Sequence, residues 1–183
     1  MYNANNLIEG DFMIIFSVLA FITLFISICI KDRNESLKVQ SINCMFESLY
    51  AFSINAYTGA VLGVINFIRS SLFIKKEKFS KQFYLSLLVI FESIVITNCI
   101  FTWNGIISLL PTTGSIVRTY CLWQSNMKYV RMSGIVSGIL FGMYYIYYQS
   151  WFMVAGYLLL FIISLYNVCK MDLKQPIQNL QKV

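Results

Sequence analysis

Long apolar runs alternate with short polar or charged stretches along the whole chain. The first run, DFMIIFSVLAFITLFISICI, gives way to the charged stretch KDRNESLK, and similar changes recur toward the C-terminus. An α-helix needs about 20 apolar residues to cross the hydrocarbon core of a bilayer. The pattern therefore predicts an all-α, polytopic membrane protein with seven transmembrane helices, at 12–30, 37–54, 57–74, 83–102, 105–123, 131–148 and 151–169.

The breaks between these runs indicate how the helices are joined. The second and third runs are separated only by the residues around Asn55, and the sixth and seventh only by those around Gln149. Both joints predict tight hairpins. The fifth run contains Pro111, which lacks a backbone N–H and should kink the helix or unwind a turn of it.

The basic residues predict the orientation in the membrane. If the N-terminus is placed outside, all 14 Lys and Arg residues lie on the inner side, in the three inner loops, the adjoining helix ends and the C-terminal tail. The outer loops contain none. Positive charge favours the cytoplasmic side. We therefore expect the N-terminus outside and the C-terminus in the cytoplasm. The basic residues are Lys31, Arg33, Lys38, Arg69, Lys75, Lys76, Lys78, Lys81, Arg118, Lys128, Arg131, Lys170, Lys174 and Lys182.

Composition narrows the class of function. The chain is 58% hydrophobic and 12% charged, whereas a soluble domain has about 45–50% and about 25%. The basic pI of 9.1 is explained by contact with anionic lipid headgroups, so no nucleic-acid partner is expected. The N-terminal stretch lacks the positive region and small-residue cleavage site of a secretory signal peptide, so the first run is expected to remain a membrane helix.

Reactive residue types are scarce. There is no histidine, and the five cysteines show no CxxC spacing, so we expect no metal, no cofactor and no disulfide framework. Paired acids and a glycine-rich phosphate loop are also missing, and every lysine lies near the inner surface. The sequence therefore predicts that the protein is not an enzyme.

The two ends of the chain resemble each other in layout. When the first run is placed on the fifth, the segment SLYAFSINAYTGAV falls on GMYYIYYQSWFMVA, so that Tyr50 meets Tyr144 and Asn55 meets Gln149. The alternative is that any two hydrophobic hairpins align tolerably. A true repeat predicts two parallel three-helix units joined by a linker helix, an arrangement used by transporters. The whole chain, 1–183, is predicted to form a single transmembrane domain. Its parts are a first three-helix repeat at 12–74, a linker helix at 83–102, a second three-helix repeat at 105–169 and a cytoplasmic tail at 170–183.

Several motifs together resemble the YgjV-type family of bacterial inner membrane proteins. The residues that carry the resemblance are Lys31-Asp32-Arg33, Gln40, Tyr50, Ala56-Tyr57-Thr58-Gly59-Ala60, Arg69, Pro111 and Arg131. Phe141 departs from the pattern, because a tryptophan is expected there. The resemblance implies a bacterial plasma (inner) membrane location and no established activity. The layout is similar to that of the SWEET, PQ-loop and PnuC-type transporters, which carry sugars, amino acids or vitamin precursors.

A polar stripe on the second helix is the first candidate site. Gln40, Asn43 and Glu47 are spaced by three and four residues, so they share one face, which should point to protein or a water-filled cavity. Together with Asn66 and Tyr144 they form the hypothetical substrate-binding set. For Asn43 and Asn66 two interpretations stay open: they contact a polar ligand, or they make packing hydrogen bonds to each other.

Two carboxylates lie within predicted membrane helices, Glu47 and Glu92. An ionised side chain facing lipid costs about 2.5–3.5 kcal/mol, so both acids are expected to be protonated, hydrated or charge-paired, and Arg69 and Arg118 are the available cations. For Glu47 three interpretations stay open: a structural ion pair, a group that exchanges a proton or couples to substrate, and simple tolerance.

The leading functional hypothesis is a transporter of a small polar solute that works by alternating access. The solute would lie among the second, third, sixth and seventh helices, near Asn43, Glu47 and Asn66. The alternative is a non-transporting scaffold or assembly factor. A polar cavity lined by Glu47 or Asn66 would favour transport, and a fully packed core the alternative. The expected partners are the lipid bilayer and a small polar solute, with a homo-oligomer left open.

Overall fold

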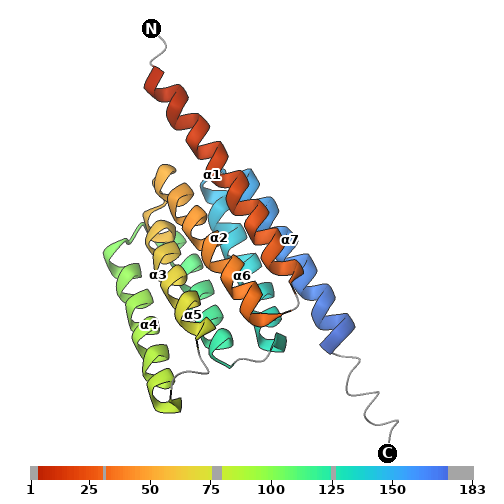
Figure 1. Ribbon diagram of the computed structural model, residues 1–183. Coiled ribbons are helices and arrows are strands. Elements are labelled where there is room, and N and C mark those ends of the chain that lie inside the picture. Colours follow the sequence, from red (N-terminus) through yellow and green to blue (C-terminus); the bar gives the residue numbers. More distant parts are fainter. Residues whose placement is uncertain (1–3, 31, 76–79, 125–126, 173–183) are drawn as a thin grey trace, which may run out of the picture.

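A computed structural model describes residues 4–30, 32–75, 80–124 and 127–172 of the chain. Within these ranges the protein is an all-α bundle of seven α-helices, so the all-α part of the predicted fold class is confirmed (Figure 1). Each predicted run corresponds to one helix. The helices are α1 (Ala4–Cys29), α2 (Arg33–Ser53), α3 (Tyr57–Ile74), α4 (Lys81–Phe101), α5 (Leu109–Trp123), α6 (Met127–Tyr147) and α7 (Trp151–Asn167), with a 3₁₀ turn η2 (Ile106–Ser108) and a π-helical segment η3 (Val168–Asp172).

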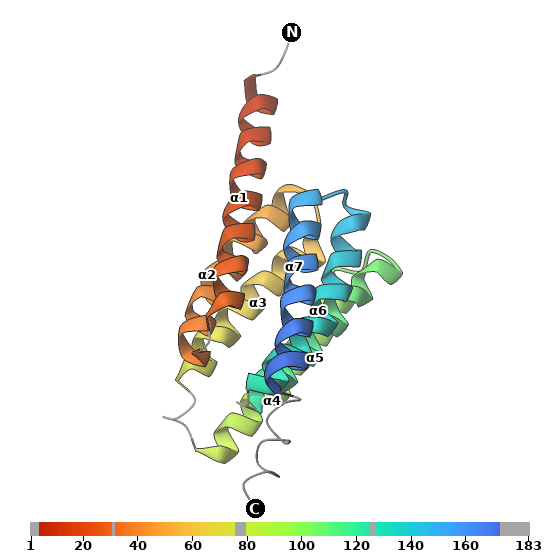
Figure 2. The same cartoon turned by 90° about the vertical axis from the view of Figure 1, so that its right-hand side faces the viewer.

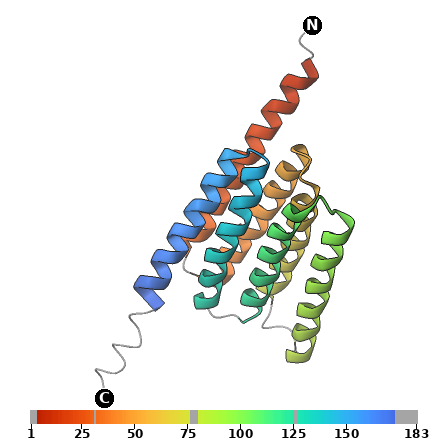
Figure 3. The same cartoon turned by 180° about the vertical axis from the view of Figure 1, so that it is seen from behind.

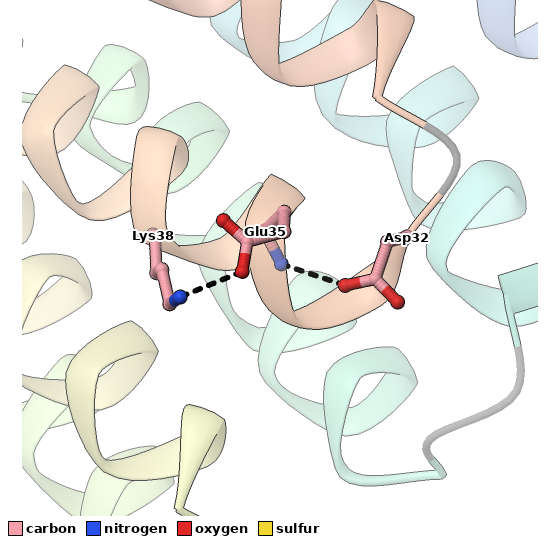
Figure 4. A network of polar contacts seen from close by, with 3 residues as sticks. All are labelled: Asp32, Glu35 and Lys38. Carbon is pink, nitrogen blue, oxygen red and sulfur yellow. Dashed lines mark hydrogen bonds and ion pairs between the residues drawn. The ribbon is translucent and has the colours of Figure 1, made fainter.

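Helix α2 begins before the apolar run does. The Asp32 side chain caps it by accepting a hydrogen bond from the backbone N–H of Glu35 at 2.9 Å. Glu35 in turn pairs with Lys38, with 2.6 Å between carboxylate and ammonium (Figure 4). These polar contacts extend the helix into the charged stretch, which the hydrophobic pattern alone assigned to a loop.

The start of α5 explains how Pro111 is accommodated. Gly105 adopts a φ of 75°, and Ile106–Ser108 form a 3₁₀ turn before α5 begins at Leu109. Pro111 therefore lies in the first turn, where its missing N–H would have no intrahelical partner in any case. The expected disturbance takes the form of an unwound first turn rather than a kink within the helix.

Two hairpin turns with the same geometry join α2 to α3 and α6 to α7. Asn55 and Gln149 adopt φ values of 58° and 55°, the left-handed conformation that commonly ends a helix. The following N–H groups then close the turn, Ala56 to the carbonyl of Ala51 at 2.9 Å and Ser150 to that of Tyr145 at 3.0 Å. Both predicted hairpins are present.

The helices pack as two groups of three with α4 on one side (Figures 1 and 3). In the first half α2 packs between α1 and α3, and in the second half α6 packs between α5 and α7. The halves meet where α1 contacts α7 and where α3 contacts α5, while α4 contacts α3 and α5. The first turns of α1 extend beyond the other helices (Figure 2).

The bundle has two chemically different ends. We call the end that carries the α2–α3 and α6–α7 turns the hairpin end. The opposite end, where α2 and α6 begin, is called the basic end, because Arg33, Lys38 and Arg131 lie there. Five of the predicted inner basic residues, Lys31, Lys76, Lys78, Lys174 and Lys182, lie outside the described residues.

Four of the seven described helices are long and apolar enough by themselves to span a membrane. The other three differ for identifiable reasons: α5 has only 15 residues, α2 contains the polar stripe, and α6 begins with a basic segment. A polytopic membrane protein is thus supported by four spans rather than by all seven predicted ones. The four apolar windows are Phe12–Cys29, Tyr57–Ile74, Gln82–Phe101 and Trp151–Lys170.

Apolar side chains cover the outside of the bundle and polar ones are enclosed. Ile100 and Phe52 are 69% and 65% exposed, whereas Gln40, Asn43 and Glu47 are buried. A soluble protein would show the opposite distribution. The exterior is therefore suited to lipid, and the enclosed polar groups have to find partners within the protein.

Close packing of α2 on α3 predicts that Gly63 cannot be enlarged. A Cβ at Gly63 would lie 2.6 Å from the Ser48 Cβ and 2.9 Å from the Cys44 carbonyl oxygen. We expect Gly63→Ala to reduce the free energy of unfolding by about 1–3 kcal/mol, the usual cost of overpacking. Thermal unfolding in detergent measures this. Gly142→Ala is the matched control, because its Cβ would meet nothing closer than 3.8 Å, and an equal loss in both variants would contradict the prediction.

Candidate functional site

The polar stripe of α2 faces the interior of the bundle, as predicted. Gln40, Asn43, Glu47 and Tyr50 are all buried, and α2 is also buried on the side that packs against α3, where Ser41 and Cys44 lie. Their shared face is directed toward α1 and toward the second half of the bundle, because their hydrogen-bond partners lie there. The stripe therefore connects the two halves.

Glu47 lies between two tyrosines of the second half. Tyr145 of α6 donates its hydroxyl proton to Oε1 of Glu47 at 2.9 Å, and Tyr157 of α7 donates to the same oxygen. Both tyrosines are buried. A carboxylate that accepts two hydroxyl groups is solvated by protein in place of water. This arrangement ties α2 to both α6 and α7.

The remaining members of the predicted substrate set have protein partners. Asn43 donates to the Ala20 carbonyl at 2.7 Å, and the side-chain oxygen of Asn66 accepts from the Ser115 hydroxyl at 2.9 Å. The Tyr144 hydroxyl accepts from the backbone N–H of Gly59 at 3.1 Å. Asn43 and Asn66 thus bond to other helices and not to each other.

Tyr144 has a counterpart in the first half. Tyr50 donates its hydroxyl to Oγ of Ser150 at 2.5 Å, in the α6–α7 turn, while Tyr144 reaches Gly59 just after the α2–α3 turn. Each half therefore sends one buried tyrosine to the hairpin of the other half.

The expected charge pairs are absent from the described residues. No nitrogen of Arg69 or Arg118 lies within 4.0 Å of a carboxylate oxygen of Glu47 or Glu92. Arg69 is buried and donates to the Thr119 hydroxyl at 2.6 Å. The partner of Arg69 is a neutral hydroxyl and not a carboxylate, so no second charge has to be desolvated to make this contact.

Arg118 contacts Gln40 across the halves. In the amide orientation that satisfies both groups, the Gln40 oxygen accepts from Nη2 of Arg118 at 2.8 Å and from Nε at 2.9 Å. A third, longer contact of 3.4 Å leads from Nη1 to the Ser137 hydroxyl. Gln40 is therefore the one member of the α2 stripe that is bonded to a cation.

A cavity of about 310 Å³ opens beside this contact, at the basic end. It lies between the two halves, since its walls come from α1, α2, α5, α6 and α7. We call it the inner cavity. Its polar lining residues are Ser27, Ser36, Gln40, Arg118, Arg131, Ser164 and Asn167.

Two further cavities lie elsewhere. One of about 590 Å³ at the hairpin end is lined by Asn55, Tyr57, Asn104, Tyr148 and their neighbours, and one of about 180 Å³ is an apolar groove between α2 and α3. Of the predicted substrate set, only Gln40 lines any of these three cavities. The cavity therefore lies closer to the basic end than the sequence placed it, and it is bordered by α1 and α5 in place of α3.

Sequence reasoning missed the two tyrosines that solvate Glu47. Tyr145 looked like part of an aromatic belt, and Tyr157 lies in the apolar seventh run. The available signal was the hydroxyl of Tyr157, which needs a partner when it is placed in the middle of a membrane helix. Which carboxylate it meets depends on how α7 packs on α2, and no local pattern encodes that.

The described residues offer no cluster of three His, Cys, Asp or Glu side chains that could hold a metal ion.

The family model described as bacterial inner membrane protein, Imp-YgjV, matches residues 12–175. The chain belongs to this family. It is therefore a multi-pass protein of the bacterial inner membrane, and the resemblance inferred from its motifs is confirmed. No curated protein and no solved structure matched the chain.

The contacts of Glu47 in this Imp-YgjV protein predict that Tyr157 stabilises the fold. In Tyr157→Phe the carboxylate loses one of two donors inside the bundle, so we expect the free energy of unfolding to fall by about 1–3 kcal/mol. Thermal unfolding in detergent provides the measurement. Tyr147→Phe is the control, because Tyr147 is 60% exposed on the same helix as Tyr145; a comparable loss there would argue against the prediction.

Proposed function

We propose that the protein is a transporter of a small polar solute that works by alternating access. The observation that carries the proposal is the inner cavity, which is polar, lies between the halves and holds the Gln40–Arg118 contact. Toward the hairpin end the space between the halves is filled by the buried Glu47, Tyr145 and Tyr157. A cavity that is accessible at one end and blocked toward the other is what one state of such a transporter requires. No catalytic step is part of the proposal.

Two observations support a parallel repeat of three helices on each side of α4. The packing partners correspond, because α2 contacts α1 and α3 as α6 contacts α5 and α7, and the α1–α7 contact corresponds to the α3–α5 contact. The hairpins also correspond, because Asn55 and Gln149 occupy equivalent positions with the same backbone conformation. Parallel repeats with a central site are a known transporter architecture.

We further propose that all seven helices cross the membrane, with the N-terminus outside. The three helices that are not apolar enough by themselves, α2, α5 and α6, pack within the bundle, where their polar side chains meet protein and not lipid. The odd number of crossings places α1 and α7 with their free ends on opposite sides (Figure 1). Basic residues then gather on the cytoplasmic side.

A scaffold or assembly factor remains the second candidate, and one observation favours it. Asn43, Glu47 and Asn66 all have hydrogen-bond partners within the protein and line none of the three cavities, so these three side chains are not set aside for a solute. Transport therefore requires these contacts to change between states, whereas a scaffold needs no such change.

Uptake into proteoliposomes tests the proposed function. Purified protein is reconstituted and exposed to a mixture of neutral, anionic and cationic polar metabolites, and the lumen is analysed by mass spectrometry. We expect at least one solute to accumulate above protein-free vesicles. Glu47→Gln should reduce that uptake, because it replaces the carboxyl group between the two tyrosines with an amide, while Tyr147→Phe should not. If no solute of any class enters, transport is ruled out for the panel and the scaffold is favoured.

Cysteine labelling tests the orientation. Cys29 and Cys169, which are exposed, are replaced by serine, and Asn104→Cys and Lys38→Cys are made separately. In spheroplasts a membrane-impermeant maleimide should label Asn104→Cys directly and Lys38→Cys only after permeabilisation. The reverse pattern would contradict the proposed topology, and labelling of both without permeabilisation would contradict seven crossings.

A further inference from the structure

We infer that the inner cavity binds the anionic group of its solute, a carboxylate or a phosphate, through Arg118. This deepens the proposed function and rests on it, because the bound anion is taken to be the transported solute.

The lining of the inner cavity is cationic. Arg118 and Arg131 both contribute to it and are half-buried, and none of its lining residues in the described part of the chain is an aspartate or a glutamate. The charge of Arg118, at this depth in a membrane bundle, is unfavourable unless an opposite charge or water compensates it. An anion in the cavity would provide that compensation.

The contacts of Arg118 leave part of its guanidinium available. Its contacts within the described residues are all to neutral oxygens, those of Gln40 and Ser137. A guanidinium carries five N–H groups in a planar fork, and these contacts occupy three of them. Gln40 holds the fork on its Nε and Nη2 side and Ser137 takes one hydrogen of Nη1, so one hydrogen of Nη1 and one of Nη2 remain for a ligand.

The nearby acids are committed to other partners. Glu47 accepts from Tyr145 and Tyr157, and Glu35 is paired with Lys38 at the surface. Asp32 caps α2 (Figure 4). The carboxylates of the described α2 region thus have partners that do not involve Arg118, which leaves a ligand to supply the counter-charge. A carboxylate or phosphate suits a guanidinium because both offer two oxygens to its parallel N–H groups.

The dimensions of the cavity restrict the ligand to a small one. About 310 Å³ is near the lower limit of pockets that bind small molecules, about 300 Å³. Hydroxyl groups of Ser27, Ser36 and Ser164 line the same space. A short organic acid or a small phosphate ester with further hydroxyl groups fits this combination of charge, size and polarity.

Ligand-induced stabilisation in neutral detergent tests the inference without transport. The probes are succinate, inorganic phosphate and, as the uncharged analogue, succinamide, all at one ionic strength set with sodium chloride. We expect succinate or phosphate, but not succinamide, to raise the unfolding temperature. In Arg118→Gln the affinity should fall about ten- to hundredfold, because a charge-assisted pair is lost.

Lys38→Gln is the matched control, since it removes one positive charge from the same end but Lys38 does not line the cavity. Equal stabilisation by succinamide, no stabilisation by either anion, or the same loss in Lys38→Gln would overturn the inference. Should Arg118→Gln fail to fold, the anion-to-amide comparison on the unaltered protein still decides. Measurements in nanodiscs distinguish two sources of the anion, a soluble solute and a lipid headgroup. If phosphatidylglycerol alone stabilises the protein, without any soluble anion, the cavity binds a lipid headgroup and the inference that it binds the anionic group of a solute is overturned.

The two proposals can fail separately. Anion binding that depends on Arg118 without any uptake would remove the transport function and leave an anion-binding site. Uptake of neutral solutes alone, with no anion binding, would leave the transporter and remove the inferred substrate class.

Discussion

A carboxylate enclosed in an apolar bundle has to receive its hydrogen bonds from the protein, and Glu47 receives them from the opposite half. The donors are Tyr145 and Tyr157, on two different helices, so one acidic side chain fixes the positions of α2, α6 and α7 relative to one another. The other polar groups between the halves follow the same principle. Asn66 meets Ser115, and Arg69 meets Thr119, each from α3 to α5. In the described part of the chain the halves are thus joined by hydrogen bonds to neutral partners or from tyrosine hydroxyls and not by ion pairs.

This mode of joining suits a membrane protein. Lipid cannot hydrogen-bond to polar groups, so each polar side chain has to be directed inward and paired. Apolar packing alone gives little preference for protein over lipid tails, whereas specific hydrogen bonds and small residues such as Gly63 determine which helices associate. The apolar exterior and the polar interior are therefore two consequences of the same solvent.

Much of the fold could be predicted from the sequence, because hydrophobic runs and turns are local features. Seven runs became seven helices, and both hairpins lie where the short polar breaks at Asn55 and Gln149 placed them. The partners of Glu47 could not be predicted, because Tyr145 and Tyr157 are far from it in sequence and meet it only through packing. The cavity beside Gln40 was likewise displaced from its expected position. A helical stripe indicates the direction of a side chain but not which neighbour fills the space before it.

The exchanged tyrosines have a consequence for the equilibrium between conformations. Separating the halves at the hairpin end would break the hydrogen bonds of Tyr50 to Ser150 and of Tyr144 to Gly59, in addition to those of Glu47. Nearer the basic end the bonds between halves are those of Arg118 to Gln40, of Arg33 to the Leu122 carbonyl and of the buried Arg69 to Thr119, and only the first two arginines are half-buried. Water can replace the bonds of half-buried arginines at little cost, but not those of buried hydroxyls. In the proposed transport cycle, an opening toward the hairpin end would therefore have to exchange the buried tyrosine bonds for other bonds within the protein.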